Sequence, residues 1–217
     1  MPETANTRQS SIRAVAGRSA LLGLVLLLAA CAASVEPGQD FPTPLVDRLP
    51  LRAALHYPPA LLEYTHQEQD SGQRKWTVQL GPVSQRMFDT VFGALFTTAS
   101  RIDDIAGARQ LAPAPDVVIE PTVSAFELST PALSGTPHFA VWIRYQLELF
   151  DAGGAPLLSW PVTGYGQAGT GGMSDEASVE RATLLALRDA AATIAVELPR
   201  QPRIRAFLDG EPVHDEP

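Results

Sequence analysis

The chain has 217 residues, a formal net charge of −8 and a single cysteine. This acidic balance gives no overall field that would attract nucleic acid or anionic lipid. One cysteine excludes a disulfide within the chain and also the cysteine-rich zinc and iron–sulfur sites. The length suffices for one domain with an ample core.

The first 30 residues have the layout of a secretory signal. Arg8, Arg13 and Arg18 precede an apolar stretch, residues 20–30, that ends directly before Cys31. A basic region, a short apolar region and small residues before a cleavage point are typical of an export signal. About 11 apolar residues are too few to cross a bilayer, which needs roughly 20.

The run 28–31 (LAAC) resembles the lipobox of bacterial lipoproteins. The resemblance implies cleavage before Cys31, diacylation of its sulfur and acylation of the new amino terminus. Ala32, where a sorting aspartate could stand, implies delivery to the outer membrane. The alternative is a buried cysteine in an ordinary signal anchor. Without residues 1–30 the chain keeps 13 basic and 23 acidic residues, a net charge of −10. Its attachment to a membrane would then depend on two or more acyl chains.

The composition divides the remaining chain into three parts. Residues 31–49 carry several prolines and no periodicity, so we expect a lipidated flexible tether. Residues 50–208 are expected to form one domain, and residues 209–217 a disordered acidic tail.

In the first half of the domain, the sequence pattern predicts two strands, a helix and a third strand. Residues 51–57 and 75–80 have the pattern of strands. Bulky apolar residues recur at helical spacing over 83–98, with Pro82 suited to the first helical turn. Residues 116–128 form a strand in which Pro121 requires an edge or a bulge, because proline donates no ladder hydrogen bond.

The second half predicts a hairpin and a helix. Residues 139–150 alternate cleanly between apolar and polar side chains, a turn follows at 151–154, and 155–165 return as the partner strand. Ser174 is a suitable N-cap for a helix that runs to about Leu198. We expect its apolar face to consist of Leu184, Leu187, Ala191, Ile194 and Leu198.

The element order is therefore β-β-α-β-β-β-α. A run of antiparallel strands with two helices predicts an α+β fold, a two-layer sandwich in which both helices cover one face of a mainly antiparallel sheet of about five strands.

Residues 164–169 (GYGQAG) match the pattern G-x-G-x-x-G. In a dinucleotide site the helix begins within that motif, whereas here residues 170–173 delay it and no later strand completes the unit. We expect a glycine-rich mobile loop over 164–172, in which Gly164 and Gly166 could contact a partner.

The sequence gives no pattern for catalysis. Its four histidines have no zinc-protease spacing, and its serines lie in no nucleophile-elbow or S-x-x-K arrangement. We therefore expect no catalytic residues, no metal, no cofactor and no nucleic-acid partner.

Aromatic residues provide the strongest candidate for a contact surface. Trp142 and Phe150 fall on the polar face of the 139–150 strand. Large aromatics on an otherwise solvated sheet face often mark a binding surface, although a loop or a neighbouring strand could instead cover them.

The mature region as a whole is similar to small outer-membrane lipoproteins, most of them uncharacterised. The residues that carry the likeness are Leu51–Leu55 before Tyr57-Pro58-Pro59, Gly81, Val117–Pro121, Val141–Leu149 with Asp151-x-Gly153, and Trp160-x-Val162-x-Gly164-Tyr165-Gly166. The element order resembles that of the lipopolysaccharide-assembly lipoprotein and of auxiliary lipoproteins of envelope lipid-transport ABC systems. The resemblance assigns a functional role to one residue only, Cys31, as the acylation site.

The leading hypothesis is a non-enzymatic lipoprotein on the periplasmic face of the outer membrane. It would support assembly or transport by binding an outer-membrane barrel or a transporter complex. The alternative is a carrier that holds a lipid or other apolar ligand between sheet and helices, in a cavity lined by Phe88, Phe92 and Leu187.

Overall fold

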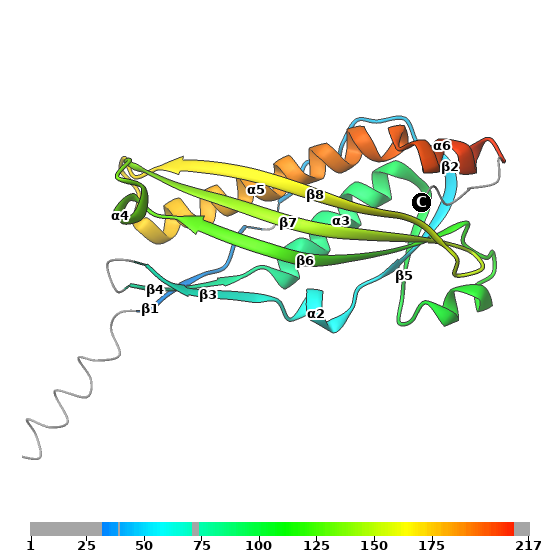
Figure 1. Cartoon of the computed structure of the whole chain (residues 1–217), viewed down its shortest axis with the longest axis horizontal. Helices are drawn as coiled ribbons and strands as arrows, with labels where there is room; N and C mark the ends of the chain where they lie inside the picture. The colour runs from blue at the N-terminus through cyan, green and yellow to red at the C-terminus, as the bar shows by residue number, and fades with distance from the viewer. Residues whose placement is uncertain (1–31, 39, 71–73, 211–217) are drawn as a thin grey trace, which may run out of the picture.

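The computed structural model describes residues 32–38, 40–70 and 74–210. It has an α+β fold, as expected from the sequence, although its strands form two sheets and not the single sheet that was predicted (Figure 1). The larger sheet has the strand order β5-β2-β6-β7-β8 and consists of β2 (Leu49–His56), β5 (Phe96–Ile102), β6 (Val117–Ser129), β7 (His138–Asp151) and β8 (Pro156–Gly169). The smaller sheet has the order β1-β4-β3 and consists of β1 (Ala32–Val35), β3 (Thr65–Gln69) and β4 (Lys75–Gln79).

Two long helices, α3 (Gly81–Leu95) and α5 (Asp175–Glu197), lie behind the larger sheet in the view of Figure 1. The prediction of two helices on one face of a five-stranded sheet is therefore confirmed. The remaining helical segments are short: α2 (Pro59–Leu62), η1 (Ala106–Gln110), α4 (Pro131–Ser134), η2 (Leu198–Arg200) and α6 (Pro202–Leu208).

The larger sheet is mixed rather than uniformly antiparallel. β6, β7 and β8 form an antiparallel meander, whereas β2 is parallel to both β5 and β6. β2 pairs with β6 only over Val117–Ile119. Pro121 lies just beyond this pairing, and a bulge follows between Val123 and Ala125. The effect expected of proline, a local edge or a bulge, is thus found within three residues of its position.

The helix predicted over 83–98 ends earlier than expected, and a strand follows it. α3 ends at Leu95, and the backbone of Phe96 is extended, with φ −104° and ψ 156°. β5 then pairs with β2, and the Thr97 hydroxyl donates to the carbonyl of Leu49 at 3.1 Å. The prediction was wrong here because the β-branched pair Thr97-Thr98 favours an extended chain next to a strand partner.

Part of the segment predicted as a flexible tether, 31–49, forms a strand instead: residues 32–35 are β1, whereas residues 36–38 and 40–48 belong to no helix or strand. β1 pairs in parallel with β4, from Ala32 opposite Lys75 to Val35 opposite Val78. The side chain of Val35 is only 2% exposed. Ala33 and Val35 therefore join the core, which proline content and lack of periodicity did not reveal, whereas Leu45 is fully exposed.

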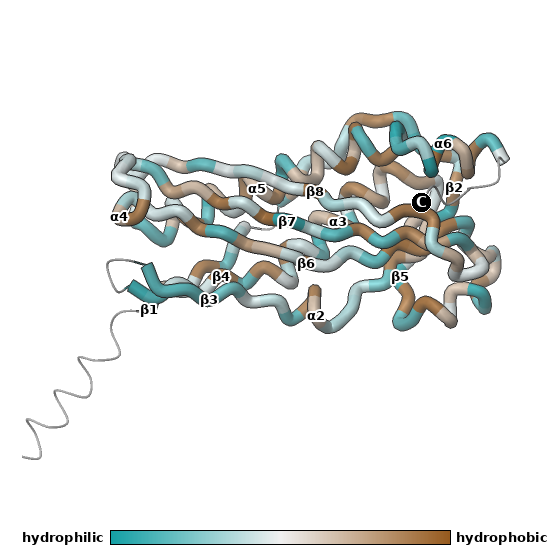
Figure 2. Tube along the Cα trace, in the orientation of Figure 1, coloured by the Kyte–Doolittle hydropathy of each residue, from teal (hydrophilic) through white to brown (hydrophobic). Residues whose placement is uncertain are grey.

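Alternation along the meander creates two different faces, and Figure 2 shows the change of hydropathy from residue to residue. The odd-numbered residues of β7 from Val141 to Leu149 are buried, as predicted. They pack with the buried face of α3, whose predicted stripe is also confirmed: Met87, Phe88, Val91, Phe92 and Leu95 are at most 1% exposed.

The buried face of α5 is wider than the predicted one. Leu184 and Ala191 are only half-buried, whereas the small residues Ala182, Ala186 and Ala190 are fully buried. The other three predicted residues, Leu187, Ile194 and Leu198, are fully buried, so the alanines widen the predicted face rather than replace it. Its N-cap is as predicted, because the Ser174 hydroxyl accepts a hydrogen bond from the Ala177 backbone N–H at 3.2 Å.

The predicted signal (1–30), the acylation site Cys31 and residues 211–217 of the predicted tail lie outside the described residues. Among the residues that are described, no helix combines the length and the apolar character needed to cross a membrane.

Candidate functional site

The face of the larger sheet opposite α3 and α5 carries a set of exposed side chains, with no helix in front of it in Figure 1. We call it the Trp142 surface and define it by Glu127 on β6, Trp142 and Arg144 on β7, and Thr163 and Tyr165 on β8. All five side chains are exposed. Three neighbouring strands therefore present them from a rigid scaffold.

An aromatic pair forms the centre of the Trp142 surface. Trp142 and Tyr165 are directly opposite each other in the β7–β8 pairing, and their ring centroids are 5.0 Å apart. Trp142 is 38% exposed and Tyr165 41% exposed. Cross-strand aromatic pairs stabilise a sheet by roughly 0.2–1 kcal/mol. Their exposed faces leave a large apolar area available for contact with another molecule.

Polar side chains beside the pair are held by hydrogen bonds. The Tyr165 hydroxyl donates to Gln167 Oε1 at 3.0 Å. Further along the same face, Gln146 donates to Ser159 at 2.8 Å, and Ser159 donates to Glu148 at 2.7 Å. These contacts fix the side chains in one arrangement and reduce the entropy lost when a partner binds.

The main chain next to the pair is also held in place. β8 is an edge strand of the larger sheet, and the backbone N–H of Tyr165 donates to Asp189 Oδ2 of α5 at 2.9 Å. A carboxylate that caps an edge N–H makes that edge less able to pair with another strand. The aromatic side chain, rather than the strand edge, is thus the feature of this region that is open to a partner.

Phe150, the second predicted contact residue, is covered. It is half-buried in a small cluster on the outer face, with Ala54, Val118 and Ala108. Ala108 belongs to η1, so the segment that follows β5 folds over this end of the sheet. Phe150 therefore does not belong to the Trp142 surface, and coverage by a neighbouring segment is the correct alternative for this residue.

Gly164 and Gly166 do not lie in a loop, because β8 continues to Gly169. Both glycines are buried against α5. A Cβ on Gly164 would lie 2.0 Å from the carbonyl oxygen of Ala186, and one on Gly166 would lie 2.0 Å from that of Ala182. Glycine is needed here for close packing of helix and strand, so the predicted loop is corrected, and contact of these two residues with a partner stays a prediction.

The sequence analysis missed Tyr165 as a site residue. The sequence does contain a signal for it, because the small residues Gly164, Gly166 and Ala168 alternate with the larger Tyr165 and Gln167. Alternation of period two continues a strand and places Tyr165 on the outer face.

Two of the histidines, His56 and His66, make contacts that stabilise the fold. His56 Nδ1 lies 2.5 Å from Glu120, and His66 Nε2 lies 2.9 Å from Glu68 while its ring packs against Phe126 at 4.5 Å. No group of three His, Cys, Asp or Glu side chains that could hold a metal occurs within residues 32–38, 40–70 and 74–210.

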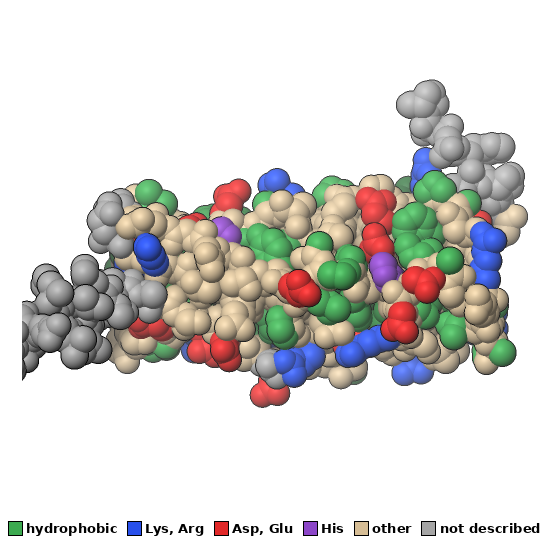
Figure 3. Space-filling model, turned by 90° about the horizontal axis from the view of Figure 1, so that it is seen from below, with side chains coloured by type: hydrophobic (Ala, Val, Ile, Leu, Met, Phe, Trp, Pro, Cys, Tyr) green, Lys and Arg blue, Asp and Glu red, His purple; other side chains and the backbone are tan. Residues whose placement is uncertain are grey.

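Charged groups are dispersed over the face drawn in Figure 3, where acidic, basic and apolar side chains alternate without a continuous basic area. One defined pair is Arg52 with Asp116, in which the guanidinium donates to the two carboxylate oxygens at 2.8 and 3.1 Å. These hydrogen bonds lower the pKa of Asp116. Pairs of this kind hold neighbouring strands and loops together rather than form an anion site.

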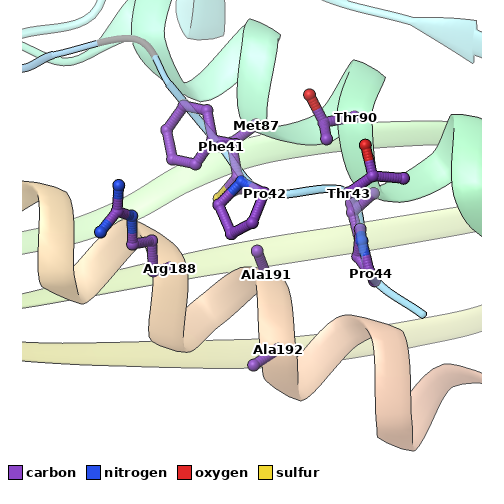
Figure 4. Close-up of a pocket in the computed structure, with 10 residues that line it drawn as sticks. Phe41, Pro42, Thr43, Pro44, Met87, Thr90, Arg188, Ala191 and Ala192 are labelled. Atoms are coloured by element: carbon purple, nitrogen blue, oxygen red, sulfur yellow. The ribbon is translucent and has the colours of Figure 1, made fainter. Parts of the chain in front are cut away.

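A small cavity lies on the helix side of the molecule (Figure 4). It is lined by residues 41–44 and by side chains of α3 and α5, among them Met87 and Ala191, and has a volume of about 160 Å³. The Arg188 side chain, which also lines it, donates to the carbonyl oxygen of Asp40 at 3.1 Å. Ligand sites usually measure about 300–1,000 Å³, so this cavity is too small for a lipid chain.

The alternative hypothesis of a carrier requires a cavity elsewhere, among Phe88, Phe92 and Leu187. All three side chains are fully buried. Phe88 and Phe92 stack with ring centroids 5.6 Å apart, and Phe88 meets the ring of Tyr145 edge-on at 5.1 Å. None of the three lines the cavity of Figure 4, so their packing gives the carrier hypothesis no support.

Several solved structures resemble this fold remotely. They include a Xanthomonas campestris protein of the DUF330 family, with a TM-score of 0.47, 14% identity and coverage of 76% of this chain and 91% of that one. A Helicobacter pylori homolog of neuraminyllactose-binding hemagglutinin has a TM-score of 0.47 and 9% identity, over 81% of this chain and 97% of that one. A Neisseria meningitidis lipoprotein has a TM-score of 0.32 and 12% identity, over 67% and 99%.

No family model matches the sequence, and no curated protein matches it either. At these identities and TM-scores the structural likenesses are too remote to assign the chain to a family.

Proposed function

We propose that this chain is a lipid-anchored protein of the bacterial envelope that binds a partner protein and catalyses no reaction. The anchor is Cys31, which follows a basic and then an apolar segment in the order of a lipoprotein signal. Acyl chains on Cys31 attach the mature protein to the periplasmic face of the outer membrane. Substitution Cys31→Ser removes the attachment and releases the protein into the soluble fraction.

The observation that carries the binding role is the exposed aromatic pair on the Trp142 surface. Tryptophan and tyrosine are enriched among the residues that dominate binding energy, because they bury a large area with little loss of conformational freedom. Trp142 and Tyr165 lie side by side on two paired strands of a packed sheet. The strands hold both rings in place before a partner arrives.

The groups around the pair favour a protein as the partner. Glu127 is directly opposite Trp142 on β6, and Arg144 is two residues away from Trp142 on β7. An aromatic centre surrounded by charges of both signs is the usual composition of a protein–protein interface. In the outer membrane, a barrel protein or a transporter complex is a partner of this kind.

The same chemistry supports a non-enzymatic role. The Trp142 surface is an exposed sheet face rather than a closed cleft, and its polar neighbours form hydrogen bonds with one another. Catalysis usually needs acid, base or nucleophilic groups that converge on a pocket from which water is excluded.

The experiment is crosslinking and affinity capture of the tagged full chain from the cell envelope, with the captured protein identified by mass spectrometry. We expect Trp142→Glu to reduce capture of the outer-membrane partner by at least about tenfold, because loss of a central aromatic typically costs 2 kcal/mol or more. The matched control is Val196→Glu on α5, where a side chain of similar exposure (44%) lies on the helix side.

A folded Trp142→Glu protein that captures the partner as well as the wild type contradicts the proposed binding surface. Equal loss with Val196→Glu also contradicts it, because binding would then not be specific to the sheet face. Copurification of lipid without any protein would favour the carrier hypothesis instead.

A further inference from the structure

Several segments that are distant in the sequence meet at one end of the molecule (Figure 1). The start of β1 pairs with the start of β4, where Ala32 is opposite Lys75. Arg74 forms ion pairs with Asp175 and Glu176 in the first turn of α5. We call this end the anchor end and define it by the start of β1, the paired residues Gln69 and Lys75 of β3 and β4, residues 130–137 with α4, and residues 170–174.

The last two segments of the anchor end are joined to each other and to the core. The backbone N–H of Thr170 donates to the carbonyl of Pro137 at 3.2 Å. One residue after His138, Phe139 packs edge-on against Trp76 of β4, with ring centroids 5.7 Å apart. The anchor end is therefore one continuous surface formed by four parts of the chain.

Part of the anchor end is uncharged and exposes apolar side chains. Residues 130–137 and 170–174 contain no Asp, Glu, Lys or Arg, although the chain carries 40 such residues in all. Leu133 in α4 is 65% exposed, and Met173 in the loop before α5 is 37% exposed. Two uncharged loops with exposed apolar tips are suited to the interface of a lipid bilayer, where charged loops would resist insertion.

The covalent chain brings the proposed lipid anchor to this same end. Cys31 directly precedes Ala32, and consecutive Cα atoms are about 3.8 Å apart across a trans peptide. Because β1 begins at Ala32 and buries Ala33 and Val35, almost no free chain remains between the anchor and the folded domain. Acyl chains on Cys31 would therefore hold the anchor end at the membrane surface.

We propose that the uncharged loops of the anchor end enter the membrane interface, with Leu133 and Met173 inserted among the lipids and the long axis of the molecule pointing away from the bilayer. This inference rests on the proposed acylation of Cys31. Trp142 lies four residues beyond His138 along β7, about 14 Å at roughly 3.4 Å per residue. Interfacial segments enter only about 5–10 Å, so the Trp142 surface stays clear of the lipid and open to a partner.

The test uses the acylated full chain in vesicles of phosphatidylethanolamine and phosphatidylglycerol that contain a spin-labelled lipid. Acylation blocks the only native thiol, so Leu133→Cys and Met173→Cys each introduce one site for an environment-sensitive fluorophore. The matched control is Ala152→Cys in the exposed β7–β8 turn. That turn is about 44 Å from His138, at roughly 3.4 Å per residue of β7.

We expect the spin-labelled lipid to remove most of the fluorescence at positions 133 and 173 and none at position 152. Protein that floats with the vesicles but shows no quenching at 133 and 173 overturns this inference and leaves the proposed anchor intact. Equal quenching at 152 also overturns it, because the domain would then lie flat. Failure to float, with no acyl group on Cys31, overturns the proposed function itself.

If the cysteine variants do not fold, Leu133→Trp and Met173→Trp report the same insertion through the quenching they show beyond that of the wild type, which has three tryptophans of its own. If the new thiol of Leu133→Cys or Met173→Cys is shielded from labelling in cells, and the same position shows no quenching in pure vesicles, these loops contact a protein partner. That result contradicts their insertion in lipid.

Discussion

Gly164 and Gly166 join a strand to a helix because they have no side chain. Their α carbons lie against the backbone of α5, and a Cβ at either position would come within 2.0 Å of a carbonyl oxygen. The complementary residues on α5 are Ala182 and Ala186, which are also small and fully buried. The G-x-G motif is therefore explained by packing.

This packing predicts a large effect of one methyl group. Gly166→Ala is expected to lower the free energy of unfolding by about 3 kcal/mol, because the backbone of α5 must move to make room. Urea denaturation followed by circular dichroism measures the change. The control is Gly171→Ala, where nothing lies within 4 Å of the added Cβ, and we expect a change within about 0.5 kcal/mol. Equal stability of the Gly166→Ala protein would contradict the close contact.

The ion pair between Arg52 and Asp116 predicts a dependence of stability on pH. Its hydrogen bonds lower the pKa of Asp116 in the folded state below that of the unfolded chain, which is about 4. The pair therefore stabilises the fold fully above that pH, and the contribution is lost as the pH falls through the folded-state pKa.

We expect Asp116→Asn to be less stable than the wild type at pH 7 and to lose this difference as the pH falls through the folded-state pKa of Asp116. Urea midpoints measured across the pH range test it. The exposed Asp103→Asn should follow the wild-type curve, and a constant gap between Asp116→Asn and the wild type at all pH values would show that the ion pair is not the cause.

At the scale of elements, the sequence predicted the strands and helices whose periodicity is regular over many residues. The alternation of β7 and the apolar stripe of α3 extend over three or more turns or repeats, so local pattern was sufficient to identify them. β1, β3 and β5 were missed. β1 has four residues, β3 is largely polar, and β5 follows α3 without a break.

The candidate site was predicted only in part, at the residue that local alternation could place. Trp142 could be placed on the outer face from alternation alone. The coverage of Phe150 by η1 and the position of Tyr165 opposite Trp142 depend on tertiary contacts, and no single stretch of sequence contains them.

The strand β1, found at residues 32–35 where a tether was predicted, can be tested by substitution. Val35→Asp places a charge at a position 2% exposed, opposite Val78, and is expected to lower the free energy of unfolding by about 3 kcal/mol. Ser34→Asp, one residue earlier and exposed, is expected to change it by less than about 0.5 kcal/mol. Thermal or urea unfolding distinguishes the two, and identical stabilities would mean that this segment is a tether after all.

At the scale of the whole molecule, the anchor and the binding surface occupy different places. The proposed lipid attachment lies at one end, beside the start of β1, and the Trp142 surface lies on the side of the larger sheet. α3 and α5 close the opposite side. A domain that stands on its anchor end would present its aromatic pair sideways, toward neighbours in the same membrane.

Binding of a partner through the Trp142 surface is tested most directly by photocrosslinking in living cells. The photoreactive amino acid is placed at Thr163, which is exposed next to the intact aromatic pair. We predict one discrete adduct with an outer-membrane protein, which disappears when Trp142→Glu is added and is absent when the probe is placed at the exposed Ala192 of α5. An adduct that persists with Trp142→Glu, or that forms only from Ala192, would contradict binding through the sheet face.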